Sequence, residues 1–305
     1  MLEIYCKTGQ GGDFQQIDAF HPGCWIYVKE AMIDDLEKIV EITGLDLADI
    51  RDSLDKYELP RIEHIGDNLI LFVRHPDEQE PGLYTTTLTI ILKDHSMIAI
   101  APHRSHLIEQ FLAKRTEFDM RQTTKAILQI LLKITQDYTT GIKKVRHSIA
   151  EPKHEHLVDS NVIILLMQNE EVLNQYLTSI VPMRNLLETM AAGRYVNLHE
   201  QDMDLLDDLM IALKQSEDVC RVNIKSIRSL RDSYQIMFTN NVNRTIKLLT
   251  ALTVIVTIPT IIASIYGMNV SLPFQHTPYA FLMILVVTVL GTATAIYLFL
   301  RKRWL

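Results

Sequence analysis

The C-terminal part of the chain contains a long segment without any fixed charge. From Leu248 to Leu300 the sequence has no Asp, Glu, Lys or Arg, whereas all 37 acidic residues of the 305-residue chain precede this segment. A helix that crosses a bilayer needs roughly 20 consecutive apolar residues. The segment is long enough for two such helices, so we predict a membrane protein, although the average composition alone would fit an ordinary soluble enzyme.

Turn-forming and polar residues divide this segment in two. The sequence Tyr266-Gly267-Met268-Asn269 is followed by Ser, Pro, Gln and His residues that are typical of a loop. We therefore predict a first transmembrane helix over about 248–266, an outer loop over 267–278 and a second transmembrane helix over 279–300. A basic tail, 301–305, ends the chain.

Basic residues flank the two predicted spans on one side only. Arg244 and Lys247 precede the first span, and Arg301, Lys302 and Arg303 follow the second, whereas the loop between them has none. The positive-inside rule places both basic flanks in the cytoplasm. We expect a multi-pass protein of the plasma (inner) membrane with both termini in the cytoplasm, and the N-terminal sequence does not predict a secretory signal.

Residues 1–117 predict a cytoplasmic N-terminal α/β domain. Strands are expected at 2–7, 24–28, 68–74, 84–92 and 97–101, and helices at 31–43, 46–55 and 105–117. The Gly9-Gln10-Gly11-Gly12 cluster lacks the Lys-Ser/Thr pair of a phosphate-binding loop, so a hairpin turn is expected there. Without the spans and their five flanking cations, the rest of the chain has 25 Lys and Arg against 37 Asp and Glu. This acidic balance argues against nucleic acid as a partner and is compatible with divalent cations.

The three cysteines, Cys6, Cys24 and Cys220, lie far apart in the sequence. They include no Cys-x-x-Cys pair, so neither a disulfide framework nor a thiolate zinc site is indicated. Reduced thiols in a cytoplasmic domain are expected.

The sequence after residue 118 predicts long helices. Residues 118–198 are expected to form long antiparallel helices, interrupted near Gly141, at Pro152, near Pro182 and at Gly193-Arg194. Between Glu200 and Ile258 there is no Gly or Pro, so one stalk helix is expected over 199–266, continuing into the first span. A lone helix of this length would leave its apolar stripe in water, which favours several parallel copies.

Polar residues in the first span share one helical face. They are Thr253, Thr257, Thr260 and Ser264, and the same spacing continues to Ile246 and Leu249. One interpretation is that the hydroxyls bond to the preceding turn or to a neighbouring helix. The other is that the polar stripe lines a water-filled pore between copies, with Ile246 and Leu249 as an apolar constriction.

The C-terminal motifs resemble one known family. Tyr266-Gly267-Met268-Asn269 at the outer end of the first span, a short loop, a second span and the terminal Arg303-Trp304-Leu305 are similar to the CorA family of divalent metal ion channels, the magnesium transporters with a Gly-Met-Asn signature. Pro60-Arg61-Ile62-Glu63 also resembles the family, and the likeness covers essentially the whole chain. It implies a homopentameric funnel: an N-terminal α/β/α domain, long helices, and a stalk helix that continues into the pore-lining first span.

The resemblance also implies a selectivity ring at Gly267, Met268 and Asn269. Mg²⁺ gives up its water reluctantly, so neutral oxygens such as the Asn269 amide would bond to the hydrated ion, and the missing Cβ of Gly267 would let the backbone turn. Local sequence alone also fits a helix C-cap. Two features depart from the family: Val270–Thr277 contains no acidic residue, and Thr257 stands where a bulky apolar residue is frequent.

An acidic group at the start of the stalk helix is a candidate regulatory site. The resemblance implies that Mg²⁺ binds between subunits at Asp208, with Asp204 beside it, as a feedback sensor. Asp77, Glu78 and Glu80 are the candidate ligands from the N-terminal domain of the next subunit. The alternative is a solvated face with favourable charge at a helix N-terminus. For His154-Glu155-His156, a solvated loop is expected rather than a zinc site.

Taken with the resemblance, these features predict a Mg²⁺ channel for passive influx, with Co²⁺ and Ni²⁺ as further candidate ions. We expect a homopentamer in the lipid bilayer, with divalent cations as its ligands and no nucleic acid. No nucleotide site or catalytic constellation is visible, so no enzyme is expected. Two alternatives remain at this point: a Zn²⁺ transporter of the same family, and a non-conducting, membrane-anchored sensor or scaffold.

Overall fold

The structure is a computed structural model that describes residues 1–7, 14–93, 95–113, 123–150, 160–193, 195, 200–270, 272–274 and 277–304. The chain forms two compact units, Met1–Ser229 and Leu230–Leu305. The long helix α6 (Glu200–Tyr266) contributes to both of them.

A mixed sheet forms the centre of the first unit. Its strands are β1 (Leu2–Lys7), β2 (Phe14–Ile17), β3 (Trp25–Val28), β4 (Arg61–Ile65), β5 (Asn68–Glu80), β6 (Leu83–Lys93) and β7 (Ser96–Ile100), in the order β2-β1-β3-β7-β6-β5-β4. Only β3 and β7 pair in parallel. The five expected strands are present, whereas β2 and β4 were not predicted. Both are edge strands, where side chains stay partly in water and the apolar signal is weak.

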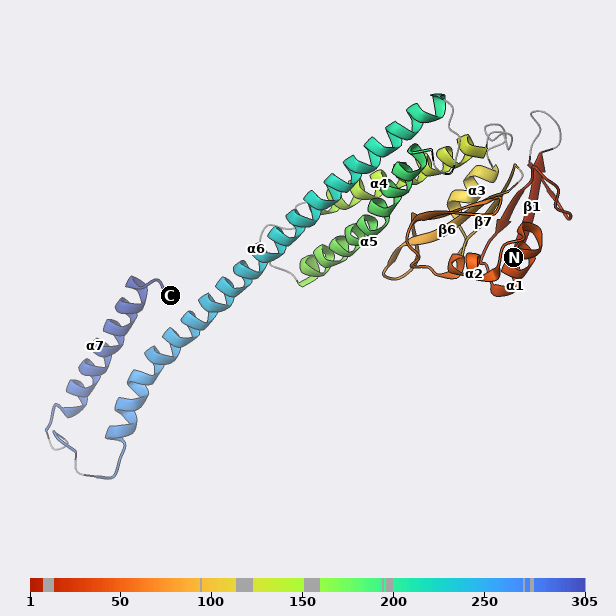
Figure 1. The fold of residues 1–305 in the computed structure, drawn as a ribbon. Coiled ribbons are helices and arrows are strands. Elements are labelled where there is room, and N and C mark those ends of the chain that lie inside the picture. The colour runs from red at the N-terminus through yellow and green to blue at the C-terminus, as the bar shows by residue number, and fades with distance from the viewer. Residues whose placement is uncertain are drawn as a thin grey trace. The chain divides into compact units, whose positions relative to one another are not determined.

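Short helices cover one face of this sheet (Figure 1). They are α1 (Ile33–Thr43), α2 (Leu47–Ile50) and the 3₁₀ helix η1 (Arg51–Leu54). Leu36, Ile39 and Ile50 are fully buried in one apolar cluster with strand residues such as Ile26 and Phe72. Burial of such side chains contributes about 1.5–3 kcal/mol each, so this cluster is a main source of stability for the domain.

Long helices cover the opposite face (Figure 1). They are α3 (His106–Ala113), α4 (Thr123–Ala150) and α5 (Ser160–Ala191). The first part of α6 contacts α4 through Thr139 and Ser216 and α5 through Glu170 and Arg228. The Tyr138 hydroxyl of α4 donates to the Arg74 carbonyl of β5 at 3.0 Å, and the Gln175 amide of α5 donates to the Gly82 carbonyl at 2.7 Å. The α/β/α domain followed by a long helix, as expected, is confirmed.

Two of the expected helix interruptions are wrong. Helix α4 runs through Gly141 and helix α5 runs through Pro182. At Gly141 the reason is packing, because an added Cβ would lie 2.5 Å from the hydroxyl oxygen of Tyr176. Pro182 removes one backbone donor, yet α5 continues through it to Ala191 and packs on the sheet and on α4. Pro152 and Arg194 lie outside the described residues, as do Gly9 to Gly12.

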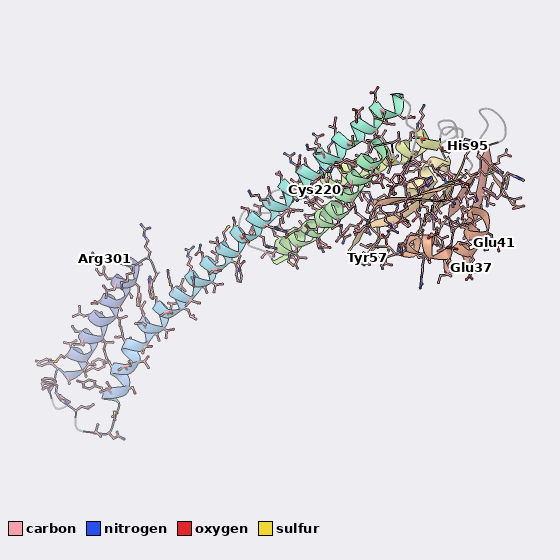
Figure 2. The ribbon with its side chains drawn as sticks, viewed as in Figure 1. Glu37, Glu41, Tyr57, His95, Cys220 and Arg301 are labelled. Carbon is pink, nitrogen blue, oxygen red and sulfur yellow. A yellow bond between two sulfur atoms is a disulfide. The ribbon has the colours of Figure 1, made fainter. Side chains whose placement is uncertain are left out.

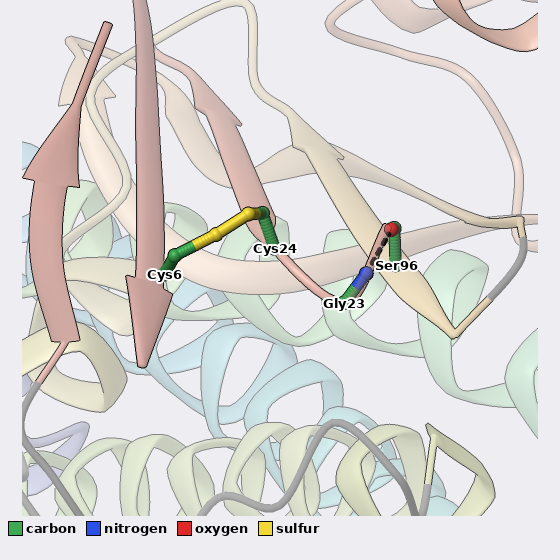
Figure 3. The surroundings of a disulfide bond; sticks show 4 residues. All are labelled: Cys6, Gly23, Cys24 and Ser96. Atoms are coloured by element: carbon green, nitrogen blue, oxygen red, sulfur yellow. Dashed lines mark hydrogen bonds between the residues drawn. A yellow bond between two sulfur atoms is a disulfide. The ribbon is translucent and has the colours of Figure 1, made fainter. Parts of the chain in front are cut away.

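The expectation of reduced thiols at Cys6 and Cys24 is also wrong, because the two form a disulfide (Figure 3). Strands β1 and β3 pair antiparallel, with Tyr5 opposite Trp25. The next pair in this register is Cys6 and Cys24, whose Cα atoms are 4.6 Å apart, within the range that a disulfide requires. The sequence separation of 18 residues gives no sign of this pairing. Cys220 is free and buried.

The second unit contains two helices that are long and apolar enough to cross a membrane. One window lies in the C-terminal half of α6 and the other in α7 (Ala280–Arg301), each with a mean hydropathy of 2.3. The buried share of the apolar window is 6% in α6 and 0% in α7. These segments are therefore not core helices of the described chain. A Cβ on Gly291 of α7 would lie 3.6 Å from Ile258 Cγ2 of α6. This proximity of α6 and α7 was not predicted, although Gly291 is the single glycine of α7.

Candidate ion pathway

The six residues of the predicted pore stripe all lie on α6, and all are exposed in the single chain: Ile246, Leu249, Thr253, Thr257, Thr260 and Ser264. The side chains of Ile246 and Leu249 are 55% and 63% exposed. Large apolar side chains that stay exposed at the start of an apolar span are candidate contacts with lipid or with a further protein chain. Other faces of this part of α6 are exposed as well, for example at Leu252 and Val256, so the exposure of the stripe is compatible with a pore but is shared with the rest of the helix.

The threonine hydroxyls of the stripe donate to the preceding turn of the helix. Thr253 Oγ1 donates to the Leu249 carbonyl at 2.9 Å, and Thr257 Oγ1 donates to the Thr253 carbonyl at 2.7 Å. Thr260 Oγ1 donates to the Val256 carbonyl at 2.8 Å. Each hydroxyl has used its one donor, and its oxygen keeps acceptor capacity. The stripe therefore offers hydrogen-bond acceptors to a ligand. Its hydroxyl donors need no further partner, because each one already donates to a carbonyl of the same helix.

The Gly267-Met268-Asn269 motif lies directly after the end of α6. The Gly267 N–H donates to the Ala263 carbonyl at 2.9 Å, and the Met268 N–H donates to the Ile265 carbonyl at 3.2 Å. These bonds close the last turn, so the motif does act as a helix C-terminus. Asn269 is exposed, and its side chain makes no hydrogen bond to any described residue. Its amide oxygen is therefore available to a ligand.

Gly267 has a different local role from the one expected. It is not among the described glycines with positive φ, so a left-handed turn does not explain its presence. An added Cβ would instead lie 3.2 Å from the Ala263 carbonyl oxygen, which is tighter than an ordinary contact. Glycine at this position lets the chain leave the helix close to its last carbonyl groups.

The residues of the predicted regulatory site lie apart in the sequence and are held on different elements. Asp204 and Asp208 are exposed on α6, while Asp77, Glu78 and Glu80 belong to β5. Among the described residues, no group of three or more His, Cys, Asp or Glu side chains could hold a metal ion.

Glu80 is already engaged in the single chain. Its carboxylate accepts a hydrogen bond from Lys56 Nζ at 2.5 Å, and His103 Nε2 lies 3.9 Å from its other oxygen. The hydrogen bond from the Lys56 ammonium lowers the pKa of Glu80. Glu80 is therefore less suited to metal binding than the exposed Glu78. His154, Glu155 and His156 lie outside the described residues, and so does His276.

Two exposed apolar helices, each long enough to cross a membrane, follow a large α/β/α domain in this chain, an arrangement that fits the class of membrane proteins. The family described as "CorA-like Mg2+ transporter protein" matches residues 22–303 of the chain. The protein belongs to this family, which is a family of transporters. The family resemblance drawn from the sequence is thereby confirmed.

Individual relatives agree with this assignment. The chain is 24% identical over 290 residues to the "Cobalt/magnesium transport protein CorA" of Methanocaldococcus jannaschii, covering 92% of this chain and 91% of that protein. The solved structure of the complete CorA magnesium transporter from the same organism superposes with a TM-score of 0.78 at 22% identity, covering 100% and 99% of the two chains. The full-length CmaX protein matches with a TM-score of 0.72 at 17% identity, covering 99% and 97%. These two structural matches show the same fold over the whole chain.

Proposed function

We propose that the protein is a magnesium channel, a homopentamer whose α6 helices surround an axial pore. The observation that carries this proposal is the exposed hydroxyl stripe of α6, which ends directly at the Gly267-Met268-Asn269 motif. A hydroxyl stripe alone does not demand a pore, because its donors are satisfied within the helix. Its continuity with an exposed amide, in a member of a Mg²⁺ transporter family, favours an ion pathway.

The chemistry of the stripe suits a hydrated cation. The water molecules around Mg²⁺ point their hydrogens outward, so the hydrated ion needs acceptors on the wall. Hydroxyls that donate backward to the helix, as at Thr253, Thr257 and Thr260, present acceptor lone pairs. The ion can then move along the wall without losing its first water shell, which Mg²⁺ releases only reluctantly.

Selectivity is proposed to arise at a ring of Asn269 side chains and Gly267 carbonyls. Neutral oxygens bond to the water shell and discriminate by size, without the strong attraction that a ring of carboxylates would exert. The acid-free loop from Val270 to Thr277 means that no loop carboxylate concentrates cations at this mouth. Entry is then driven by the membrane potential, worth about 4.6 kcal/mol for a divalent ion per 100 mV.

The gate is proposed to lie at Ile246 and Leu249, near the inner end of the first span. Both side chains are exposed and apolar, and rings of such side chains can close a narrow pore by excluding water. Thr257 would keep its own level of the pore wet. The constriction would therefore be restricted to the cytoplasmic end of the stripe.

The proposed topology has both termini in the cytoplasm of a cell with this protein in its plasma membrane. The basis is the asymmetric distribution of Arg244, Lys247, Arg301, Lys302 and Arg303 around the spans. The Cys6–Cys24 disulfide points the other way, because disulfides are more frequent outside reducing compartments than in the cytoplasm. We base the orientation on the basic flanks, because they act directly on membrane insertion.

Ion flux into vesicles tests the proposed function. Purified full-length protein in sealed vesicles should admit Mg²⁺ when a negative internal potential is applied, and empty vesicles should not.

The acid-free loop also favours a second candidate, a Zn²⁺ transporter of the same family. Competition among Mg²⁺, Co²⁺, Ni²⁺ and Zn²⁺ separates the two, because a zinc transporter would be blocked by Zn²⁺ at far lower concentrations than by Mg²⁺. Absence of flux for every ion would indicate a non-conducting scaffold.

Cysteine labelling tests the pore stripe. Cysteines introduced at Thr253, Thr257, Thr260 or Ser264 should react with a small hydrophilic thiol reagent in the open channel, because these positions would face water. Cysteines at Val254 and Ile262, on other faces of the same helix, should react at least about tenfold more slowly, since thiolates form poorly in an apolar surrounding. Native cysteines add little background, because Cys6 and Cys24 are bonded and Cys220 is buried. Equal labelling of both sets would contradict the assignment.

A further inference from the structure

Five cations in the second unit have no counter-charge in the described structure. Arg244 and Lys247 lie on α6, and Arg301, Lys302 and Arg303 lie at the end of α7 and just beyond it. All five are exposed, and none forms an ion pair with a described residue. From position 233 to the C-terminus the sequence contains no Asp or Glu. The nearest acid along α6 is Asp232, twelve residues before Arg244 and therefore ~18 Å away.

The five cations lie at one level along the two helices. A Cβ added at Gly291 would lie 3.6 Å from Ile258 Cγ2, so these two residues lie at the same level of the two antiparallel helices. Arg301 lies ten residues beyond Gly291, and Leu248 lies ten residues before Ile258. Each interval corresponds to ~15 Å of helix. The end of α7 therefore reaches the height of Leu248, next to Lys247 and within about one helical turn of Arg244.

This level is the margin of the apolar spans. The uncharged segment begins at Leu248 and ends at Leu300, so the cations stand where the hydrocarbon ends and the headgroups begin. Figure 2 shows the Arg301 side chain projecting from the C-terminal end of α7. Trp304 follows directly and stacks on Phe299, with ring centroids 5.6 Å apart. Tryptophan rings prefer the interface between hydrocarbon and headgroups, which favours a position of the tail at that depth.

From this placement we infer that the five residues form a binding collar for anionic phospholipid headgroups of the leaflet on that side. The collar is defined as Arg244, Lys247, Arg301, Lys302 and Arg303. Its arginines offer planar pairs of N–H donors that match the oxygens of a phosphate. Juxtamembrane clusters of Lys and Arg attract anionic lipids over zwitterionic ones. In an oligomer the collars of neighbouring copies would repel one another, and bound phosphates would relieve that repulsion.

The inference rests on the proposed membrane topology, but it does not require ion conduction. Purified full-length protein is kept in detergent with equal amounts of phosphatidylglycerol and phosphatidylcholine, and the phospholipid that copurifies is extracted and quantified. Wild-type protein should enrich phosphatidylglycerol about tenfold, as expected for a few interfacial cations. The triple variant Arg301→Gln, Lys302→Gln, Arg303→Gln should lower this ratio to near one. Equal ratios for wild type and variant would overturn the proposal.

A matched control removes three exposed cations elsewhere. The variant Lys143→Gln, Lys144→Gln, Arg146→Gln, on α4 of the first unit, changes the net charge equally and should keep the wild-type lipid ratio. A comparable loss in this control would show that overall charge, and not the collar, selects the lipid.

Arg301→Lys with Arg303→Lys retains charge and should retain most of the enrichment. If the glutamine triple variant fails to assemble by size-exclusion chromatography, Arg244→Gln with Lys247→Gln tests the same collar from α6, and an unchanged ratio there would contradict it.

Discussion

Replacement of Asn269 by Ala should reduce Mg²⁺ flux to the level of empty vesicles. The side chain is exposed and makes no hydrogen bond to any described residue, so its removal takes away the amide oxygens of the ring without disturbing core packing. We therefore expect the variant to assemble like the wild type and to keep its thermal stability within about 0.5 kcal/mol, as surface substitutions generally do. Vesicle flux and size-exclusion chromatography measure the two effects separately.

Val270→Leu is the matched control for this experiment. Val270 is exposed beside Asn269 but lies outside the Gly267-Met268-Asn269 motif, and the change keeps an apolar side chain while removing no oxygen. This variant should conduct Mg²⁺ within about twofold of the wild type, since exposed substitutions away from a site have small effects. Wild-type flux in a well-assembled Asn269→Ala protein would show that selectivity does not depend on this amide.

The sequence predicted those parts of the fold that repeat a strong pattern. The uncharged segment after Lys247 and the Gly- and Pro-free run after Glu200 indicated the two apolar helices and the long helix, because membranes and helices impose strict demands on composition. Helix α1 and the buried strands β5 and β6 were also recognisable from apolar periodicity. Edge strands such as β2 were missed, because half-exposed strands need few apolar residues.

Tertiary contacts account for the errors. Gly141 indicated an interruption when read alone, but its lack of a side chain accommodates Tyr176, which is distant in the sequence. Cys6 and Cys24 gave no motif, because the register of β1 on β3 brings them together. In the candidate pathway the sequence predicted that Asn269 lies at the end of a helix. The role of Gly267 could be recognised only from the structure, because it depends on the distance to the Ala263 carbonyl oxygen. Sequence spacing does not predict such a distance.

Replacement of Asp208 by Lys should make the channel insensitive to Mg²⁺ on the cytoplasmic side. We propose that Mg²⁺ binds between Asp208 of one copy, supported by Asp204, and a carboxylate of the next copy, with exposed Glu78 and half-buried Asp77 as candidates. Bound Mg²⁺ would hold the stalk helices together and keep the constriction at Ile246 closed. When Mg²⁺ is low, repulsion between carboxylates would loosen the ring. A lysine at position 208 puts a fixed positive charge where the ion would bind, so it would mimic the bound state at every Mg²⁺ concentration.

The measurement is flux against internal Mg²⁺ for the wild type, Asp208→Lys and Asp207→Lys. Asp207 is exposed on the same turn of α6, but it points about 100° away around the helix, so its replacement changes charge equally and leaves the proposed ligand in place. A ligand shifts an equilibrium only by its differential affinity for the two states, and several equivalent sites acting together should give the wild type and Asp207→Lys a steep inhibition curve. In Asp208→Lys this curve should flatten, or its midpoint should move by about tenfold, a change typical of allosteric coupling. If the midpoint and steepness of Asp208→Lys equal those of the wild type, the acidic start of α6 is a solvated helix end whose charge favours the N-terminus, and regulation must be sought elsewhere in the chain.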